Sequence, residues 1–227
     1  DVVTIDRLYA SIPNTPQANY LVKVTCEDNT PITVVGGVYS VNEDECKPTL
    51  LEVLYEDTTA STTALTGNNQ YLVRNKSVPL FTATGISALK HATISSVKVN
   101  LNEVETPLTL SETTASGIGT VVNSAVSIYA NFIVTDSRGI TTTKEKLVNI
   151  YDWFEPEALI ALERKSNNTG AITVDANYAL IGGHNTLTIN GYIKKTSESE
   201  FTSIGSITSN VEKTFSLDEN YDYDVKV

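Results

Sequence analysis

The sequence predicts an all-β protein built from tandem antiparallel β-sandwich domains. Segments with alternating apolar and polar residues recur about every 8–12 residues, and clusters of turn residues separate them. A similar series of segments returns after 108 positions, which is close to the length of one sandwich domain of about 100 residues. Thr, Val, Ser and Asn are abundant, and Tyr occurs 11 times, which favours strands over helices.

Composition indicates a folded protein and argues against nucleic acid as a partner. Of the 227 residues, 41% are hydrophobic and 19% are charged. The net charge is −11, and no cluster of Lys and Arg offsets it, so phosphate groups would be repelled. No apolar run approaches the roughly 20 residues that a membrane-spanning helix needs. We therefore expect neither nucleic-acid binding nor membrane insertion.

Two segments, Ala18–Asn29 ("ANYLVKVTCEDN") and Ile128–Gly139 ("IYANFIVTDSRG"), begin the repeat. Both contain an aromatic residue, alternating apolar residues, a Val-Thr pair and a polar turn. An extended strand follows each of them, at Ile32–Val41 and at Ile140–Ile150. Each pair is predicted to form a hairpin of two antiparallel strands.

Each hairpin leads to a proline, Pro48 or Pro156, and then to an apolar segment. After Pro48 the segment is "TLLEVLYED", and after Pro156 it is Glu157–Lys165 ("EALIALERK"). The second segment is rich in helix formers, but its place in the repeat predicts a first strand.

The last residues repeat the pattern a third time, because Tyr223–Val227 ("YDVKV") matches Tyr20–Thr25 ("YLVKVT"). The expected organisation is therefore the C-terminal part of a first domain at 1–46, a complete sandwich at 47–154, and a third sandwich at 155–227 without its closing strand. On this interpretation the chain is a piece of a longer protein.

Alternation at both ends of the chain predicts strands there as well. The stretch Asp1–Ile5 is strand-like, and Tyr221, Tyr223, Val225 and Val227 are expected to point inward from the strand before the last. A strand in that position would leave a free sheet edge, open to the next stretch of the polypeptide or to a neighbouring chain.

Longer strings carry a family resemblance. The string Tyr55–Leu101, with its Leu-Thr-Gly-Asn tetrad at Leu65–Asn68 and its "YLVRNKS" and "ATISSVKV" stretches, resembles the immunoglobulin-like repeats of minor structural and tail proteins of long-tailed bacteriophages. The string Arg164–Ile207 is similar to a second repeat subtype of those proteins. "VTDSRG" looks like their common turn between the last two strands, and "CEDNTP" departs from it.

The resemblance implies tandem immunoglobulin-like sandwiches in a non-enzymatic structural protein of a virion, associated with the tail, fibre or baseplate. It would act as a spacer or as an adhesion and display module for host attachment. The implied partners are other virion proteins, a host cell-surface receptor or glycan, and further copies in a homo-oligomer. The implied location is the virion or the extracellular space. The alternatives are a bacterial surface adhesin and a carbohydrate-binding module of an extracellular enzyme.

Catalytic and cofactor-binding residues are not predicted. His91 and His184 fall in different predicted domains, and no G-x-S-x-G nucleophile motif exists. Gly117-Ile118-Gly119 lacks the third glycine and the following helix of a phosphate-binding loop.

Hard oxygens suited to calcium occur in three acidic segments: Asn42–Glu45, Asp218–Asn220, and the pair Asp222 and Asp224. No D-x-[DN]-x-[DN]-G loop is present, so solvated acidic loops are the expectation and no metal site is predicted.

Trp153-Phe154 could form a ligand platform, although packing between domains is favoured. The sequons at Asn75 and Asn167 matter only in a eukaryotic secretory context.

Two registers are open for the first hairpin, and they differ in what they predict for the cysteines. A turn at Asp28–Pro31 places Cys26 opposite about Thr33, which puts Cys46 on the order of 40 Å away and excludes a disulfide. A turn at Gly36-Gly37 would instead bring Cys26 next to Cys46. The first register is favoured.

Overall fold

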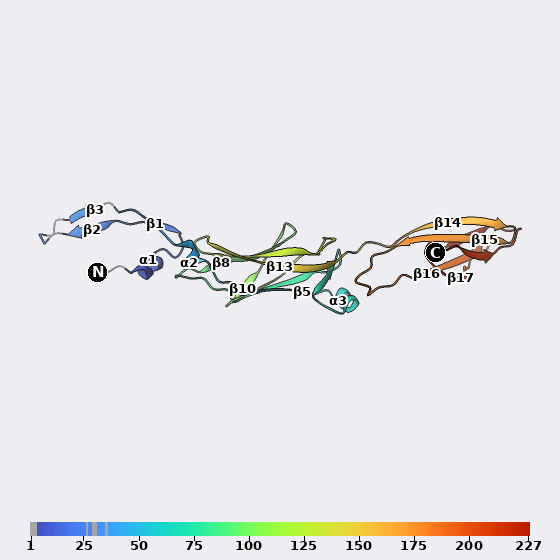
Figure 1. Ribbon diagram of the computed structural model, residues 1–227, viewed down its shortest axis with the longest axis horizontal. Coiled ribbons are helices and arrows are strands. Elements are labelled where there is room, and N and C mark those ends of the chain that lie inside the picture. The colour runs from blue at the N-terminus through green and yellow to red at the C-terminus, as the bar shows by residue number, and fades with distance from the viewer. Residues whose placement is uncertain (1–3, 26, 29–30, 35) are drawn as a thin grey trace. The chain divides into compact units, whose positions relative to one another are not determined.

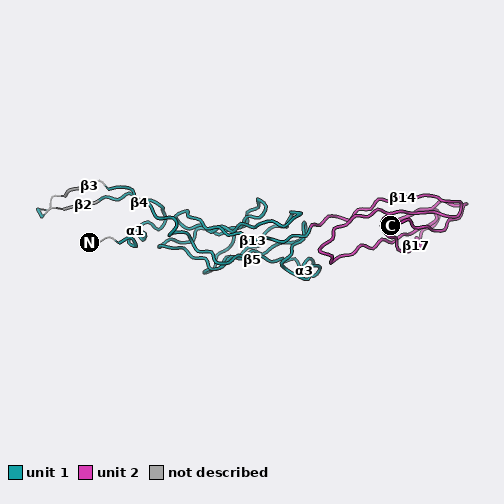
Figure 2. The backbone as a smooth tube through the Cα atoms, viewed as in Figure 1, with its two compact units in different colours: residues 1–151 teal, residues 152–227 magenta. Residues whose placement is uncertain are grey.

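The chain folds into two compact units, Asp1–Tyr151 and Asp152–Val227 (Figure 2). This computed structural model describes residues 4–25, 27–28, 31–34 and 36–227, and for 22–25 and 31–34 it describes the backbone only. Strands dominate both units (Figure 1), so the predicted all-β fold class is confirmed. No helix in the described residues is both long enough and apolar enough to cross a membrane.

Short helices interrupt the first unit: α1 (Ile5–Ser11), α2 (Glu43–Cys46) and α3 (Ala60–Thr66). Each begins or ends at a residue that suits a helix terminus. The side chain of Thr4 accepts from the N–H of Arg7, and that of Asn42 accepts from Asp44. The last helix ends at Gly67, whose φ of +66° is left-handed. The expected strand at Asp1–Ile5 is therefore wrong at Ile5, and its first three residues lie outside the described residues.

Residues 1–46 form paired strands after α1: β1 (Gln17–Asn19), β2 (Val22–Thr25), β3 (Pro31–Val34) and β4 (Val38–Ser40). β1 pairs with β4 and β2 with β3, both antiparallel. The turn lies between Thr25 and Pro31, which are partners, so the rival turn at Gly36-Gly37 is wrong. Lys23 rather than Cys26 opposes Thr33. Cys26 lies outside the described residues, and Cys46 is a free, buried thiol.

The rest of the first unit is one sandwich of two sheets. Its strands are β5 (Glu52–Asp57), β6 (Tyr71–Val73), β7 (Pro79–Thr84), β8 (Ile94–Leu101), β9 (Val104–Pro107), β10 (Thr109–Ser111), β11 (Thr114–Ile118), β12 (Ile128–Asp136) and β13 (Thr141–Tyr151). One sheet has the order β10-β11-β7-β5 and the other β6-β13-β12-β8-β9. All pairs are antiparallel except β6 with β13. This arrangement is immunoglobulin-like.

Side chains from both sheets interdigitate between them. Phe81 of β7 and Phe132 of β12 meet edge to face with their ring centroids 5.9 Å apart, and both are fully buried. Alternation in β12 explains this placement, since Ala130, Phe132 and Val134 point inward while Tyr129 is exposed. The core extends from Leu50 to Ile150.

The second unit has two three-stranded sheets. Its strands are β14 (Glu157–Ser166), β15 (Thr169–Asn177), β16 (Ile189–Lys195), β17 (Thr202–Ile207), β18 (Lys213–Ser216) and β19 (Tyr223–Lys226). The orders are β14-β15-β18 and β17-β16-β19, all antiparallel. The strand expected at Glu157–Lys165 is confirmed as β14. Ile172, Val174 and Ile207 form the buried core.

At the end of the chain the expectation of four inward side chains is only partly met. Val225 packs against the core of the second unit, and Tyr223 is half-buried. Tyr221 and Val227 are exposed, so the expectation is wrong for them.

Candidate functional site

The turn between β12 and β13 is organised by a buried carboxylate. Oδ1 of Asp136 accepts hydrogen bonds from the N–H of Arg138 at 2.9 Å and of Ile140 at 2.8 Å. Gly139 has a φ of +86°, which the tight turn requires and which glycine adopts without a steric penalty. This is the "TDSRG" turn that the sequence predicts, and its geometry directs Arg138 back over the end of the sandwich.

Arg138 fixes three parts of the first unit to one another. Its residue exposure is 6%, and its Nε donates to the carbonyl oxygen of Ile12 at 3.1 Å. Its Nη1 donates to Leu89 at 3.3 Å, and its Nη2 donates to the carbonyl of Lys90. The fork of guanidinium donors thereby joins the N-terminal segment and the β7–β8 loop to the turn.

The charge of Arg138 is partly compensated by the same turn. Oδ2 of Asp136 lies 3.8 Å from Nη1 of Arg138, and both side chains are buried. This oxygen makes no hydrogen bond with any described residue. A buried ion pair of this kind adds little net stability, but removing either partner would leave the other charge buried without compensation, which is costly.

The guanidinium lies beside an apolar cluster that we call the junction core: Tyr9, Ile12, Val41, Cys46 and Ile140. The Arg138 guanidinium lies 5.8 Å from the centroid of the Tyr9 ring, a distance suited to a cation–π contact. The rings of Tyr9 and Tyr39 meet edge to face at 6.3 Å. Burial raises the pKa of Tyr9 to about 12, and the nearby Cys46 and Tyr39 add to this rise.

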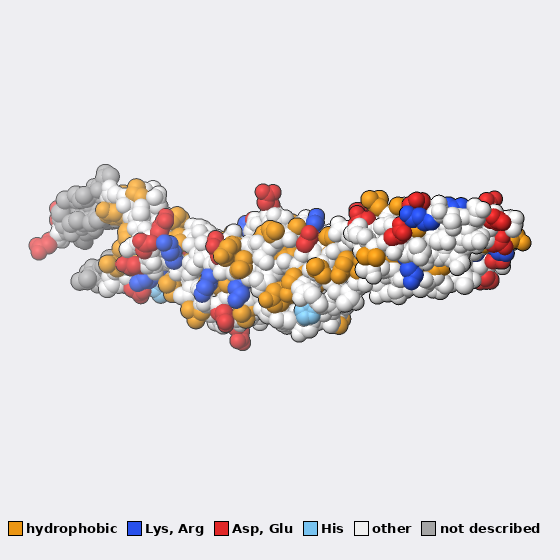
Figure 3. Space-filling model, turned by 45° about the vertical axis from the view of Figure 1, so that its right-hand side comes forward, with side chains coloured by type: hydrophobic (Ala, Val, Ile, Leu, Met, Phe, Trp, Pro, Cys, Tyr) orange, Lys and Arg blue, Asp and Glu red, His pale blue; other side chains and the backbone are white. Residues whose placement is uncertain are grey.

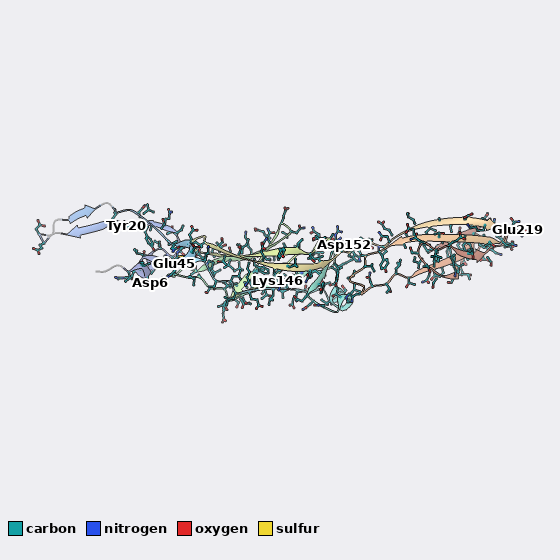
Figure 4. All side chains as sticks on the ribbon, viewed as in Figure 1. Asp6, Tyr20, Glu45, Lys146, Asp152 and Glu219 are labelled. Carbon is teal, nitrogen blue, oxygen red and sulfur yellow. The ribbon has the colours of Figure 1, made fainter. Side chains whose placement is uncertain are left out.

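Polar contacts surround the junction core. Asp6 on α1 and Glu45 on α2 are labelled in Figure 4. Oδ1 of Asp6 lies 3.0 Å from Nε2 of His91, and Oε2 of Glu45 lies 3.8 Å from Nζ of Lys90. These exposed pairs contribute little individually. They do link both N-terminal helices to the loop whose carbonyls Arg138 holds.

Hydroxyl groups of the β12–β13 hairpin attach the N-terminal segment to the sandwich at Pro13 and at Pro48. Oγ of Ser137 donates to the carbonyl of Pro13 at 2.6 Å, and Oγ1 of Thr142 donates to that of Pro48 at 2.6 Å. The whole arrangement therefore acts as a clamp: it holds backbone carbonyls with donors and presents no paired nucleophile and base.

A second polar network is buried at the opposite end of the same sandwich. Asp57 accepts from Oγ1 of Thr62 at 2.5 Å, from Oγ of Ser77 at 2.6 Å and from the N–H of Thr59 at 2.9 Å. Oγ of Ser77 in turn accepts from the N–H of Val73. This network anchors α3 and the loop before β7, so it stabilises the fold. Ser77 of the first sequon is fully buried within it.

The two histidines lie in different units of the chain. His91 belongs to the clamp through Asp6, and both it and Lys90 have left-handed φ values of +65° and +51°. His184 lies in the β15–β16 loop of the other unit, where its N–H donates to Ile181. Gly117 and Ile118 are the last two residues of β11, so the Gly117–Gly119 stretch is not a loop that leads into a helix.

Carboxylates in the acidic segments already have local hydrogen-bond or ion-pair partners. Asp44 pairs with Lys47 at 2.7 Å, and this bond lowers the pKa of Asp44. Hydrogen bonds from Asn220 lower the pKa of Asp218, and Asp224 lies 3.2 Å from Nζ of Lys194. No group of three or more metal-ligating side chains exists among the residues that the structure describes.

Trp153 and Phe154 lie in the segment before β14, and both are half-buried. Sequence reasoning missed Arg138 as the centre of a site. The D-S-R-G turn was recognised, but the partners of the arginine lie up to 126 positions away, which no local pattern indicates.

Comparison with protein-family models found no match, and neither did comparison with curated proteins. Among solved structures, the chain is similar to domains A168-A170 from titin, with a TM-score of 0.32 and 9% identity, covering 90% of this chain and 75% of that one. It is also similar to dimeric latent PorU from Porphyromonas gingivalis, with a TM-score of 0.30 and 10% identity. That match covers 90% of this chain and 20% of the PorU chain.

Proposed function

We propose that this chain is a non-enzymatic structural component of a bacteriophage virion, associated with the tail, fibre or baseplate. Its immunoglobulin-like sandwiches would act as spacers that carry an adhesion or display module toward the host. The clamp around Arg138 is the observation that supports the spacer role, because it fixes the segment before the sandwich through side-chain hydrogen bonds to backbone carbonyls rather than through a loose linker.

A spacer has to transmit position and resist aggregation. The clamp serves the first need, since a buried guanidinium that holds three carbonyls resists rotation of the segment it joins. Acidic side chains, interspersed with Lys and Arg over the visible face (Figure 3), serve the second. The net charge of −11 keeps copies from associating non-specifically. The phage assignment rests on the resemblance of the repeat strings.

The carbohydrate-binding alternative requires aromatic rings that are open to a sugar. In the second unit, Nζ of Lys226 lies 4.3 Å from the ring centroid of Phe201 and 5.3 Å from that of Tyr192. Nζ of Lys195 lies 3.5 Å from the ring centroid of Tyr221. Lysine ammonium groups thus lie against these three rings, which leaves them less open to stacking on a sugar.

The test is to locate the protein. Antibodies against the first unit would be applied to particles purified from the host that carries the gene, and labelling would be examined by immunogold electron microscopy. We expect labelling on the tail or baseplate of particles. Labelling on intact cells that release no particles would replace the proposal with the adhesin alternative, and binding on a glycan array would favour the carbohydrate-binding module.

A further inference from the structure

The inward face of β13 changes from apolar to charged along the strand. Val148, near its C-terminal end, is fully buried. Lys144 is the cross-strand partner of Phe132, and Phe132 is fully buried. Lys146 is the partner of Ala130, which is also fully buried. Because cross-strand partners point to the same face of a sheet, both lysines lie on the face that is turned toward the core.

The charged half of β13 is also the half with a free edge. On one side, β12 pairs with β13 from Thr141 to Val148. On the other side, β6 pairs only with Asn149–Tyr151, and among the described residues no further strand pairs with that side. The change from valine to lysine on the inward face therefore falls where the cover by β6 ends.

The free edge presents a row of backbone donors and acceptors. The N–H of Asn149 points away from β12, because it donates to Oη of Tyr55 on β5. Alternate residues of a strand direct their backbone groups to the same edge, so Thr143, Glu145 and Leu147 direct theirs to the free edge. Such a row is a template on which a strand of another molecule can pair.

The lysine side chains lie beside this edge. Nζ of Lys144 donates to the carbonyl oxygen of Leu51, which directly precedes β5 in the opposite sheet, so the ammonium group lies at the opening between the sheets. Lys146, labelled in Figure 4, is half-buried and extends from the same face two residues further on. A strand added to β13 would bring its inward side chains against both ammonium groups. It would thereby remove water from charges that it does not pair, which is costly.

We propose that Lys144 and Lys146 bar the free edge of β13 to strands of other molecules. The contact that they prevent is the pairing of β13 with β13 of a second copy around a two-fold axis, in which two free antiparallel edges would complete each other. The aliphatic stems lie on the core side of the strand, and the ammonium groups keep the opening hydrated. The sandwich thereby resists self-association at this edge without a covering strand.

The test replaces both charges with the side chain of a strand former. In Lys144→Val/Lys146→Val the inward face of β13 becomes more apolar, while the outward backbone groups stay as they are. We expect this variant of the full chain to dimerise with a dissociation constant at least about tenfold lower than that of the wild-type chain, a difference of about 1.4 kcal/mol. Sedimentation equilibrium measures the association. The same association as in the wild-type chain would overturn the proposal.

Lys98→Val is the matched control. Lys98 is the partner of Ile133 in the same sheet, and Ile133 alternates with the buried Phe132, so Lys98 extends from the outer face. The substitution removes the same charge and adds the same side chain away from the free edge. We expect the dissociation constant to stay within about twofold of the wild-type value. Equal association of the control and the valine variants would overturn the proposal.

Glu145→Pro locates the contact. Added to the two valine substitutions, it removes one N–H from the free edge, which edge strands tolerate, so we expect the dimer to dissociate. Glu145→Gln keeps this N–H and should leave the dimer intact. A dimer that persists with proline, or that dissociates equally with glutamine, would contradict pairing through β13.

A single substitution covers the case in which the double variant does not fold, which circular dichroism reveals. Lys146→Val keeps the bond from Lys144 to Leu51 and exposes the same edge. We expect it to associate more strongly than Lys98→Val. Equal association of these two single variants would overturn the proposal.

Discussion

Nε of Arg138 donates a hydrogen bond to the carbonyl oxygen of Ile12 across 3.1 Å, although 126 positions separate the two residues in the chain. The same guanidinium donates to the carbonyls of Leu89 and Lys90, so one side chain in the β12–β13 turn joins the end of α1 to the β7–β8 loop. Buried donors of this kind specify a single arrangement, because any other arrangement leaves carbonyls unpaired.

Replacing Arg138 should release the N-terminal segment. In Arg138→Met the carbonyls lose their donor and Asp136 keeps a buried charge, so we expect the free energy of unfolding of the first unit to fall by about 3 kcal/mol. Denaturant unfolding measures the loss, and amide hydrogen exchange should accelerate in α1. Arg164→Met, at an exposed arginine of β14, is the matched control and should change stability by less than about 0.5 kcal/mol. Unaltered exchange in α1 would contradict the clamp.

Tyr9 should make the first unit sensitive to alkali. Burial raises the pKa of Tyr9 from 10.0 to about 12, so the stability is unaffected below pH 10, where the phenol is protonated in both states. Between pH 10 and 12 the unfolded chain loses this proton and the folded chain keeps it, so unfolding becomes easier by about 2 to 3 kcal/mol. Unfolding measured from pH 8 to 12 checks the slope. Tyr9→Phe should lose this component, whereas Tyr129→Phe, at an exposed tyrosine, should keep it.

Phe132 should dominate the core of the sandwich. Phe132→Ala removes the ring that meets Phe81 edge to face, and the cavity left behind should cost about 3–5 kcal/mol. Tyr129→Ala, on the same strand but 58% exposed, should cost far less. Thermal or denaturant unfolding distinguishes the two, and a comparable loss for both variants would argue against the alternation assigned to β12.

Asp57 should be required as a carboxylate. In Asp57→Asn the new amide group turns a donor toward Thr62 or Ser77, where Oδ2 now accepts two hydroxyl hydrogen bonds, so we expect a loss of about 2 kcal/mol. Asp175→Asn, an exposed position on β15, provides the control. The comparison is made by denaturant unfolding at neutral pH. If both substitutions prove equally mild, the hydroxyl network does not depend on the charge.

Much of the fold could be predicted from local patterns. Alternation predicted the strands around Phe132, because a period of two is imposed by the strand geometry itself. The place of Glu157–Lys165 in the repeat predicted β14 against its own helix propensity. The D-S-R-G turn was also visible, since Asp136 and Gly139 satisfy that turn with bonds and torsions close to them in the chain. The first strand at Asp1–Ile5 was wrong at Ile5, because the cap at Thr4 is a weak signal in a β-rich sequence.

Only the tertiary structure decided what those elements do. Two apolar strands, β5 and β14, occupy corresponding places in the repeat, yet Tyr55 is buried and Leu162 is exposed, because burial depends on which other strands lie opposite. The partners of Arg138 could not be predicted from the sequence either. Any residue type has a backbone carbonyl that can accept a hydrogen bond, so Ile12 and Leu89 carry no sequence signature of this contact. The sequence by itself determined which segments are strands and where they turn, because those choices depend on near neighbours. The clamp was decided by the packing of distant segments.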